Sequence, residues 1–147
     1  MPYTLTHIRI LRAPAERVWR ALTEPSAIVK WNPPDGFIAI VKEMDFRPGG
    51  RFRMSFINFA SGQEHSFGAS YCEIVPNQKL VAREQFDDPT LAGNVATSFQ
   101  LRPVACGTEL VVEQAGIPDA IPAESCRLGW QQSFELLARL VEAEIKA

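Results

Sequence analysis

The sequence contains very little cysteine and histidine. Its 147 residues include three cysteines, Cys72, Cys106 and Cys126, and two histidines, His7 and His65. The cysteines are odd in number, far apart and without a CxxC spacing, so neither a disulfide framework nor a zinc ribbon is supported. Two isolated histidines do not form a metal site. We therefore expect buried, reduced thiols, histidines that are structural or exposed, and neither a metal nor another cofactor.

Long apolar runs and a strong excess of either charge are also missing. No run approaches the ~18–20 apolar residues that span a bilayer, and residues 1–19 alternate and carry charge instead of forming a signal region. The formal net charge is −2, whereas a nucleic-acid binder normally carries a basic patch. These features predict a cytoplasmic protein with no nucleic-acid partner and no membrane insertion.

The motifs of common catalytic and nucleotide-binding sites are absent. No serine lies in a nucleophile-elbow motif, no cysteine has an obvious histidine partner, and no GxGxxG or P-loop sequence occurs. The glycine pair in Arg47-Pro48-Gly49-Gly50 could hold a phosphate, but it joins two expected strands. That context favours a tight turn, steadied by Asp45 and Arg47. Glu84 could act as a base if burial raised its pKa, but it has no visible partner. The sequence therefore favours a binding module over an enzyme.

The chain does contain a regular order of amphipathic segments. Residues 4–11 alternate as a strand does, and residues 12–23 and 25–31 are expected to form two short helices, with Pro14 at the first helical position of one of them. Six further strand segments, separated by turn residues, are 37–46, 51–59, 64–75, 79–86, 94–104 and 108–116. Short connections between successive strands favour an antiparallel meander.

The last segment, Pro122 to Ile145, has the spacing of a long amphipathic helix. Its expected apolar stripe is Leu128, Trp130, Phe134, Leu137, Leu140, Val141 and Ile145, and its polar face is Glu135, Arg139, Glu142 and Lys146. A helix of about 24 residues is ~36 Å long, and only a twisted sheet of about seven strands offers enough surface to bury its stripe. We expect a single α+β domain over residues 1–147, in which a curved antiparallel sheet wraps around the C-terminal helix as a helix grip.

Five segments resemble, in order, the successive motifs of a known family. They are "APAERVWRALTEPSAIVKW", "DFRPGGRF", "YCEIVPNQKLV", "GTELVVEQ" and "GWQQSFELLARL". The family is that of activator of heat-shock-protein ATPase homologue-like proteins, in the START-like or SRPBCC superfamily with the Bet v allergen-type helix-grip fold. The resemblance implies a deep cavity between the sheet and the C-terminal helix, where superfamily members bind lipids, sterols, aromatic hormones or polyketides and some perform chemistry. Asn32 stands where relatives often carry another tryptophan, so the cavity mouth is expected to differ from theirs.

The residues expected to bind a ligand in this cavity come from alternate strand positions and from the helices. The full set is Trp31, Phe37, Phe52, Met54, Phe56, Asn58, Glu84, Phe99, Gln114, Trp130 and Phe134. Trp31 is either a lid residue or simple packing, and Trp130 is either core or cavity wall. Asn58, Glu84 and Gln114 are polar residues on otherwise apolar faces. Because an unpaired buried polar group costs ~1–3 kcal/mol, each either lies exposed near a strand end or orients a ligand.

Together these features predict a small-molecule binding module with an internal cavity for an apolar or amphipathic ligand, lipid-like or aromatic. Two alternatives stay open: an enzyme of the cyclase, dehydratase or hydrolase kind that uses the same cavity, and a co-chaperone-like protein-interaction module. A chaperone partner and a homodimer are left open as well.

Overall fold

The computed structural model describes residues 1–91 and 93–145. Within them, seven strands form one sheet: β1 (Tyr3–Leu11), β2 (Phe37–Met44), β3 (Arg51–Asn58), β4 (Glu64–Val75), β5 (Lys79–Phe86), β6 (Val95–Val104) and β7 (Gly107–Ile117). The helices are α1 (Ala15–Thr23), α2 (Pro25–Trp31), the short 3-10 helix η1 (Pro89–Leu91) and α3 (Ala123–Glu142). The strand order is β1-β7-β6-β5-β4-β3-β2, with antiparallel neighbours throughout. The expected α+β helix grip is confirmed.

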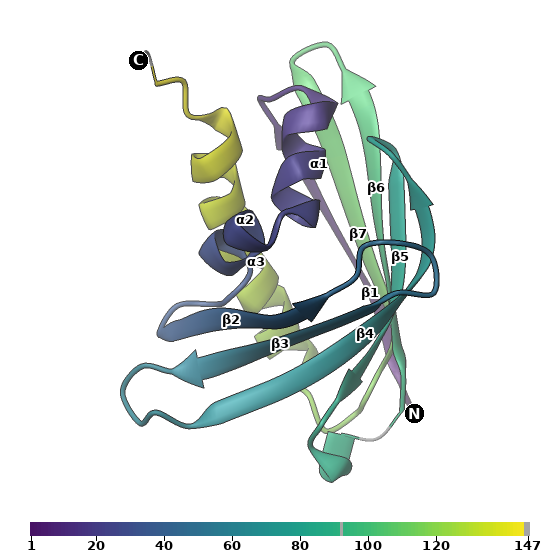
Figure 1. The fold of residues 1–147 in the computed structure, drawn as a ribbon, viewed down its shortest axis with the longest axis vertical. Coiled ribbons are helices and arrows are strands. Elements are labelled where there is room, and N and C mark those ends of the chain that lie inside the picture. Colours follow the sequence, from purple (N-terminus) through teal and green to yellow (C-terminus); the bar gives the residue numbers. More distant parts are fainter. Residues whose placement is uncertain (92, 146–147) are drawn as a thin grey trace.

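The sheet is strongly curved, and the helices lie in its hollow (Figure 1). Strands β2, β3 and β4 run at a steep angle to β6 and β7, so the sheet wraps around α3. Register shifts interrupt the pairing near Thr4 in β1, between Val41 and Glu43 in β2, and between Tyr71 and Glu73 in β4. Such bulges bend a strand and increase its twist, which gives the sheet its concave face.

The start of α1 differs from the expectation. Pro14 is not the first helical residue but the N-cap, with an extended conformation (φ −68°, ψ 154°). Its carbonyl accepts hydrogen bonds from the backbone N–H groups of Arg17 and Val18, at 3.0 and 3.2 Å. Pro25, in contrast, lies in the first turn of α2, where a missing N–H group costs nothing because that group would have no helical partner.

The apolar face of α3 is shorter than the spacing suggests. Phe134, Leu137 and Val141 are buried as expected, and Trp130 is half-buried. The assignment of Leu128 and Ile145 to this face is wrong, because they are 55% and 89% exposed. Leu128 lies two residues before Trp130 and therefore points to another side of the helix, whereas Ile145 lies beyond the helix end. Lys146, expected on the polar face, lies outside the described residues.

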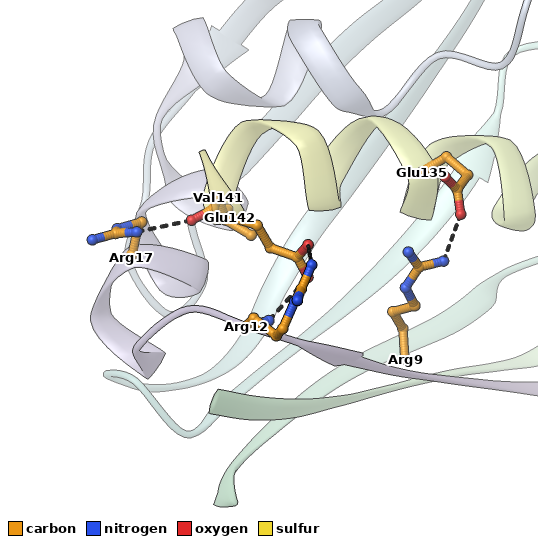
Figure 2. A network of polar contacts seen from close by, with 6 residues as sticks. All are labelled: Arg9, Arg12, Arg17, Glu135, Val141 and Glu142. Carbon is orange, nitrogen blue, oxygen red and sulfur yellow. Dashed lines mark hydrogen bonds and ion pairs between the residues drawn. The ribbon is translucent and has the colours of Figure 1, made fainter. Parts of the chain in front are cut away.

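Polar contacts hold the C-terminal half of α3 against β1 and α1 (Figure 2). Arg9 Nη1 donates to Glu135 Oε1 at 2.8 Å, and Arg17 Nη1 donates to the carbonyl oxygen of Val141 at 3.0 Å. The backbone N–H of Arg12 donates to Glu142 Oε2 at 2.9 Å. This last contact makes Glu142 half-buried, with 22% of its side chain exposed, where full exposure was expected.

The tightly packed core lies at this same end of the molecule. Leu11, Val18, Leu110, Leu137 and Val141 are at most 1% exposed and come from β1, α1, β7 and α3. The backbone of α3 approaches β1, α1 and α2 most closely. Packing is therefore densest beneath the C-terminal half of α3. Within the described residues, no helix is long and apolar enough to cross a membrane.

The Pro-Gly-Gly segment before β3 is a tight turn, as expected. Gly49 has a positive φ of 83°, and its N–H donates to the carbonyl of Tyr71 at 2.8 Å. The Gly50 N–H donates to the carbonyl of Arg47 at 2.8 Å, and Arg47 Nε donates to Asp45 Oδ2 at 2.8 Å. Both glycine amides are thus bonded within the fold, which leaves neither of them free to hold a phosphate.

The cysteines are free thiols, but their expected burial is wrong for two of them. Cys72 and Cys106 are exposed, and Cys126 is half-buried. Cys72 is the extra residue at the β4 bulge, and Cys106 lies in the turn between β6 and β7. Neither position can be recognised from composition alone.

Candidate functional site

A cavity of about 410 Å³ lies between the concave face of the sheet and the N-terminal half of α3. Its sheet wall consists of Phe52, Met54 and Phe56 from β3, Phe67, Ala69 and Tyr71 from β4, Leu80, Ala82, Glu84 and Phe86 from β5, Phe99 from β6 and Gln114 from β7. The helical wall includes Leu22, Ile28 and Trp31 from α1 and α2, and Ser125, Cys126, Gly129, Trp130 and Ser133 from α3. The cavity is adjacent to the packed core and partly open to solvent.

The strand register explains why these side chains share one surface. Phe52 pairs with Ala69, which pairs with Glu84 on the next strand. Met54 and Phe86 flank Phe67 in the same way. Directly paired residues of neighbouring strands point to the same face of a sheet. Alternate residues of β3, β4 and β5 therefore form a continuous wall.

Eight of the eleven residues expected from the sequence line the cavity. They are Trp31, Phe52, Met54, Phe56, Glu84, Phe99, Gln114 and Trp130. Phe52 and Met54 are 8% and 2% exposed, and Phe56 is half-buried. The aromatic face of β3 thus borders a cavity instead of a filled core.

The other three expected residues lie elsewhere. Phe37 borders a separate surface hollow beside α2, and its ring lies 6.3 Å from that of His65. Asn58 ends β3, where its Oδ1 accepts hydrogen bonds from the backbone N–H groups of Ala60 and Ser61 and so stabilises the turn. Phe134 is 5% exposed and belongs to the core.

Sequence reasoning missed much of the wall on β4 and β5. The missed residues include Phe67, Ala69, Tyr71, Leu80, Ala82 and Phe86. The sequence contained the pattern needed to identify them, because they occupy alternate positions of the two strand segments that the sequence predicted. Once Glu84 is assigned to the inner face, Ala82 and Phe86 must share it.

The two tryptophans of the cavity are held in fixed orientations. Trp31 is 1% exposed and donates from Nε1 to the carbonyl of Ala21 at 2.7 Å, so it is a packed wall residue and not an exposed lid. Trp130 donates from Nε1 to Gln114 Oε1 at 2.8 Å. The Trp130 ring also stacks on the imidazole of His7, with ring centroids 5.6 Å apart. Trp130 therefore is cavity wall, and the Gln114 carbonyl is already occupied by the indole.

A small group of polar side chains is placed on the otherwise apolar sheet wall. Glu84 is half-buried, and burial raises the pKa of its carboxyl group, an effect that the nearby Thr97 hydroxyl opposes. Burial, followed by the negative charge of Glu84, raises the pKa of Tyr71. Thr97 is fully buried, and its Oγ1 lies near the Glu84 carboxyl group without a hydrogen bond of ordinary geometry within the described residues. Glu84 and Tyr71 line the cavity and are available to a ligand, whereas Thr97 is not a lining residue.

His7 lies behind this wall and not on it. Burial, and after it the positive charge of Arg127, lowers the pKa of the imidazole. Its Nε2 is buried without a hydrogen-bond partner among the described residues. The neutral ring serves as a packing surface for Trp130 and Phe134. His65, at the far end of β4, is exposed.

Comparisons with known proteins agree with this description of the fold. A family model described as "Activator of Hsp90 ATPase homolog 1-like protein" matches residues 12–142. The crystal structure of a Chromobacterium violaceum protein is 50% identical, with a TM-score of 0.95, and the match covers 98% of this chain and 100% of that one. A Rhizobium leguminosarum protein is 27% identical, with a TM-score of 0.77 and coverage of 98% and 97%.

A protein from Rhodobacter sphaeroides, 23% identical with a TM-score of 0.84, shares the fold over 95% of this chain and 92% of its own. No functionally curated protein matches the chain. The comparisons thus establish the fold and the family, and the function has to be inferred from the cavity.

Proposed function

The chain belongs to the activator of Hsp90 ATPase homolog 1-like family, and we propose that it binds an apolar or amphipathic small molecule, aromatic or lipid-like, in the cavity beneath α3. The observation that carries this proposal is a cavity of about 410 Å³ walled largely by aromatic rings. The rings belong to Trp31, Phe52, Phe56, Phe67, Tyr71, Phe86, Phe99 and Trp130. Ligand sites of ~300–1,000 Å³ with apolar walls and a few polar groups are typical of proteins that bind small molecules.

The volume of the cavity also supports an occupant. At ~24 cal/mol per Å³, a dry void of 410 Å³ would cost about 10 kcal/mol. Domains have a total stability of only ~5–15 kcal/mol, so a dry void of this size would be hard to maintain, and because the cavity is partly open to solvent, the alternative to a ligand is water. Water can fill part of it, but aromatic walls offer water few hydrogen-bond partners. An apolar ligand would release that water and bury the rings.

The test is a thermal-shift screen of neutral aromatic compounds, sterols and fatty alcohols against the wild type and two variants. Ala82→Phe places a ring in the cavity from the middle of β5, where Ala82 is 6% exposed. The control, Ala96→Phe, makes the same change at an exposed position on the neighbouring strand β6. Ala96 pairs with Arg83, on the outer face of the sheet, whereas Ala82 pairs with Thr97 on the inner face.

A ligand at about a hundred times its dissociation constant adds ~2.7 kcal/mol, which raises the melting temperature by roughly 5–10 °C. We expect this shift in the wild type and in Ala96→Phe, and its loss in a folded Ala82→Phe variant. If no compound shifts the wild type, or if Ala82→Phe responds as the wild type does, the proposal is wrong.

A further inference from the structure

We propose that the cavity selects its ligand by charge, accepting an aromatic amine as a cation with Glu84 as the counter-ion and disfavouring carboxylates such as fatty acids. This inference rests on the proposed function, since it specifies the ligand class of the same cavity. The observation behind it is that, among the described residues, the cavity wall carries negative charge and no positive charge.

The wall carries one acidic side chain and no basic one. Among the lining residues that the structure describes, none is lysine, arginine or histidine, and Glu84 is the carboxylate. The other titratable wall residues are Tyr71 and Cys126, neither of which becomes positively charged. A carboxylate ligand would therefore lose its hydration without gaining a cationic partner, and it would also be repelled by Glu84.

Glu84 itself has no protein cation to pair with. It takes part in none of the ion pairs of the described residues. The neighbouring Arg83 is exposed on the opposite face of β5, and Arg53 pairs with Asp87. A buried charge without a partner is costly. An ammonium group on the ligand would supply the missing partner in a charge-assisted hydrogen bond.

The surroundings of Glu84 suit an aromatic cation for a second reason. Phe86 follows Glu84 on the same face of β5, and its ring centroid lies 6.5 Å from that of Phe67 on β4. The π-faces of such rings attract cations, most strongly where water is excluded. Thr97 is fully buried beside Glu84 and is not one of the lining residues, so its hydroxyl acts on the Glu84 carboxyl group and not directly on a ligand.

The charge of Glu84 makes amine binding depend on pH. The groups that act on Glu84 or are acted on by it are Thr97 from β6 and Tyr71 from β4, and the remaining titratable residue of the wall is Cys126 from α3. Burial raises the pKa of the Glu84 carboxyl group, so in the free protein this group keeps its proton to a higher pH than an exposed glutamate does. A cationic ligand favours the carboxylate and expels that proton. Affinity for an amine should therefore rise as pH increases through the raised pKa and then level off below the pKa of the amine.

The experiment uses three probes with one ring system and different head groups: naphthylmethylamine, naphthylmethanol and naphthoate. Titration calorimetry at neutral pH measures their affinity for the wild type, for Glu84→Gln and for a control, Glu113→Gln. Glu113 lies exposed on β7 and pairs with Thr6 and Ser98 on the outer face of the sheet. Its removal therefore changes the net charge equally without changing the cavity.

We expect the wild type to bind the amine about 10- to 100-fold more tightly than the alcohol, the range of one charge-assisted hydrogen bond, and to bind the carboxylate most weakly. Glu84→Gln should reduce amine affinity to that of the alcohol, and Glu113→Gln should leave all three affinities unchanged. The wild-type ranking stands independently of how well either variant folds.

The outcomes separate this inference from the proposed function. If the three probes bind the wild type equally, or the carboxylate binds best, charge selection is wrong while the cavity still binds ligands. An amine preference that persists in folded Glu84→Gln also overturns it. If none of the three probes binds the wild type at all, this inference fails and the thermal-shift screen decides whether the proposed function fails with it.

Discussion

At position 84 a carboxyl group lies on the concave face of the sheet, half-buried among apolar side chains and without an ion-pair partner in the described residues. The folded state pays for this arrangement, because an ionised carboxylate is better solvated in the unfolded chain. Groups that cost stability and that a better-packed residue could replace are characteristic of binding sites, where stability is exchanged for function. Glu84 is accordingly the residue at which stability and ligand binding oppose each other.

This opposition predicts a stability change with a defined pH dependence. Because burial raises the folded-state pKa of Glu84 above an unfolded value of about 4.3, the folded protein binds more protons, and stability falls as pH rises between the two values. Glu84→Gln has no carboxyl group to ionise, so it does not lose stability in this way as the pH rises. Urea denaturation should find the variant more stable than the wild type by about 1–3 kcal/mol at about pH 8, with the difference shrinking near pH 4.

The exposed Glu113→Gln variant serves as the control for that comparison, and it should track the wild type at both pH values. If Glu84→Gln were instead less stable than the wild type by the same amount at pH 8 and at pH 4, the folded protein would accommodate the carboxylate well. Burial of the charge would then not raise the pKa of Glu84.

Among the elements, α3 covers the cavity, and polar contacts hold this helix to its neighbours along much of its length. Contacts from Arg9, Arg12 and Arg17 hold the C-terminal half of the helix against β1 and α1. In the N-terminal half, Trp130 Nε1 donates to Gln114 Oε1 on β7, and at the middle of the helix Ser133 Oγ donates to the carbonyl of Asn32 at 2.8 Å. From Ser125 to Ser133 the helix covers the hollow of the sheet without filling it.

Two glycines, Gly50 in the turn before β3 and Gly129 in α3, should show opposite changes in stability when each is replaced by alanine. A Cβ on Gly50 would lie 1.9 Å from the backbone oxygen of Asp45, whereas a Cβ on Gly129 in α3 would meet nothing within 4 Å. Gly50→Ala should therefore cost about 1–3 kcal/mol through strain in the turn. Gly129→Ala should stabilise the protein by up to about 1 kcal/mol, because alanine favours the helix.

Chemical denaturation of both variants against the wild type measures the difference. Equal stabilities for the two variants would show that the turn before β3 relaxes easily, and that the close approach to Asp45 does not constrain this corner of the sheet.

The sequence predicted the elements better than the details of their faces. The bounds of α2, β4 and β5 agree with the structure, because clear turn residues flank them. Leu128 and Cys72 were misplaced for physical reasons that the local pattern does not contain. The face of a helix that packs depends on where its partner lies, and a bulge shifts the side-chain alternation within a strand.

The cavity wall was predictable where alternation alone decided it, as for Phe52, Met54 and Glu84. Whether that face bordered a cavity or a filled core was not, because periodicity is identical in the two cases. The Trp130–Gln114 hydrogen bond and the unpaired Thr97 hydroxyl also depend on contacts between distant segments. Such contacts follow from the curvature of the whole sheet.

In the molecule as a whole, the cavity is the place where we propose that a small molecule binds. The three methionines allow this to be tested in one spectrum. Met54 lines the cavity, Met1 is 96% exposed, and Met44 lies at the end of β2, outside the cavity wall. Isotope labelling of the methionine methyl groups therefore gives one reporter inside the site and two internal controls.

The decisive measurement is a titration of the methyl-labelled protein with naphthylmethanol, with the Met54 signal assigned through Met54→Leu. A ring in an aromatic cavity shifts nearby methyl resonances, so we predict a saturable shift of the Met54 signal while those of Met1 and Met44 stay in place. A saturable shift at Met1 or Met44 with an unmoved Met54 would place binding on the surface and contradict the account.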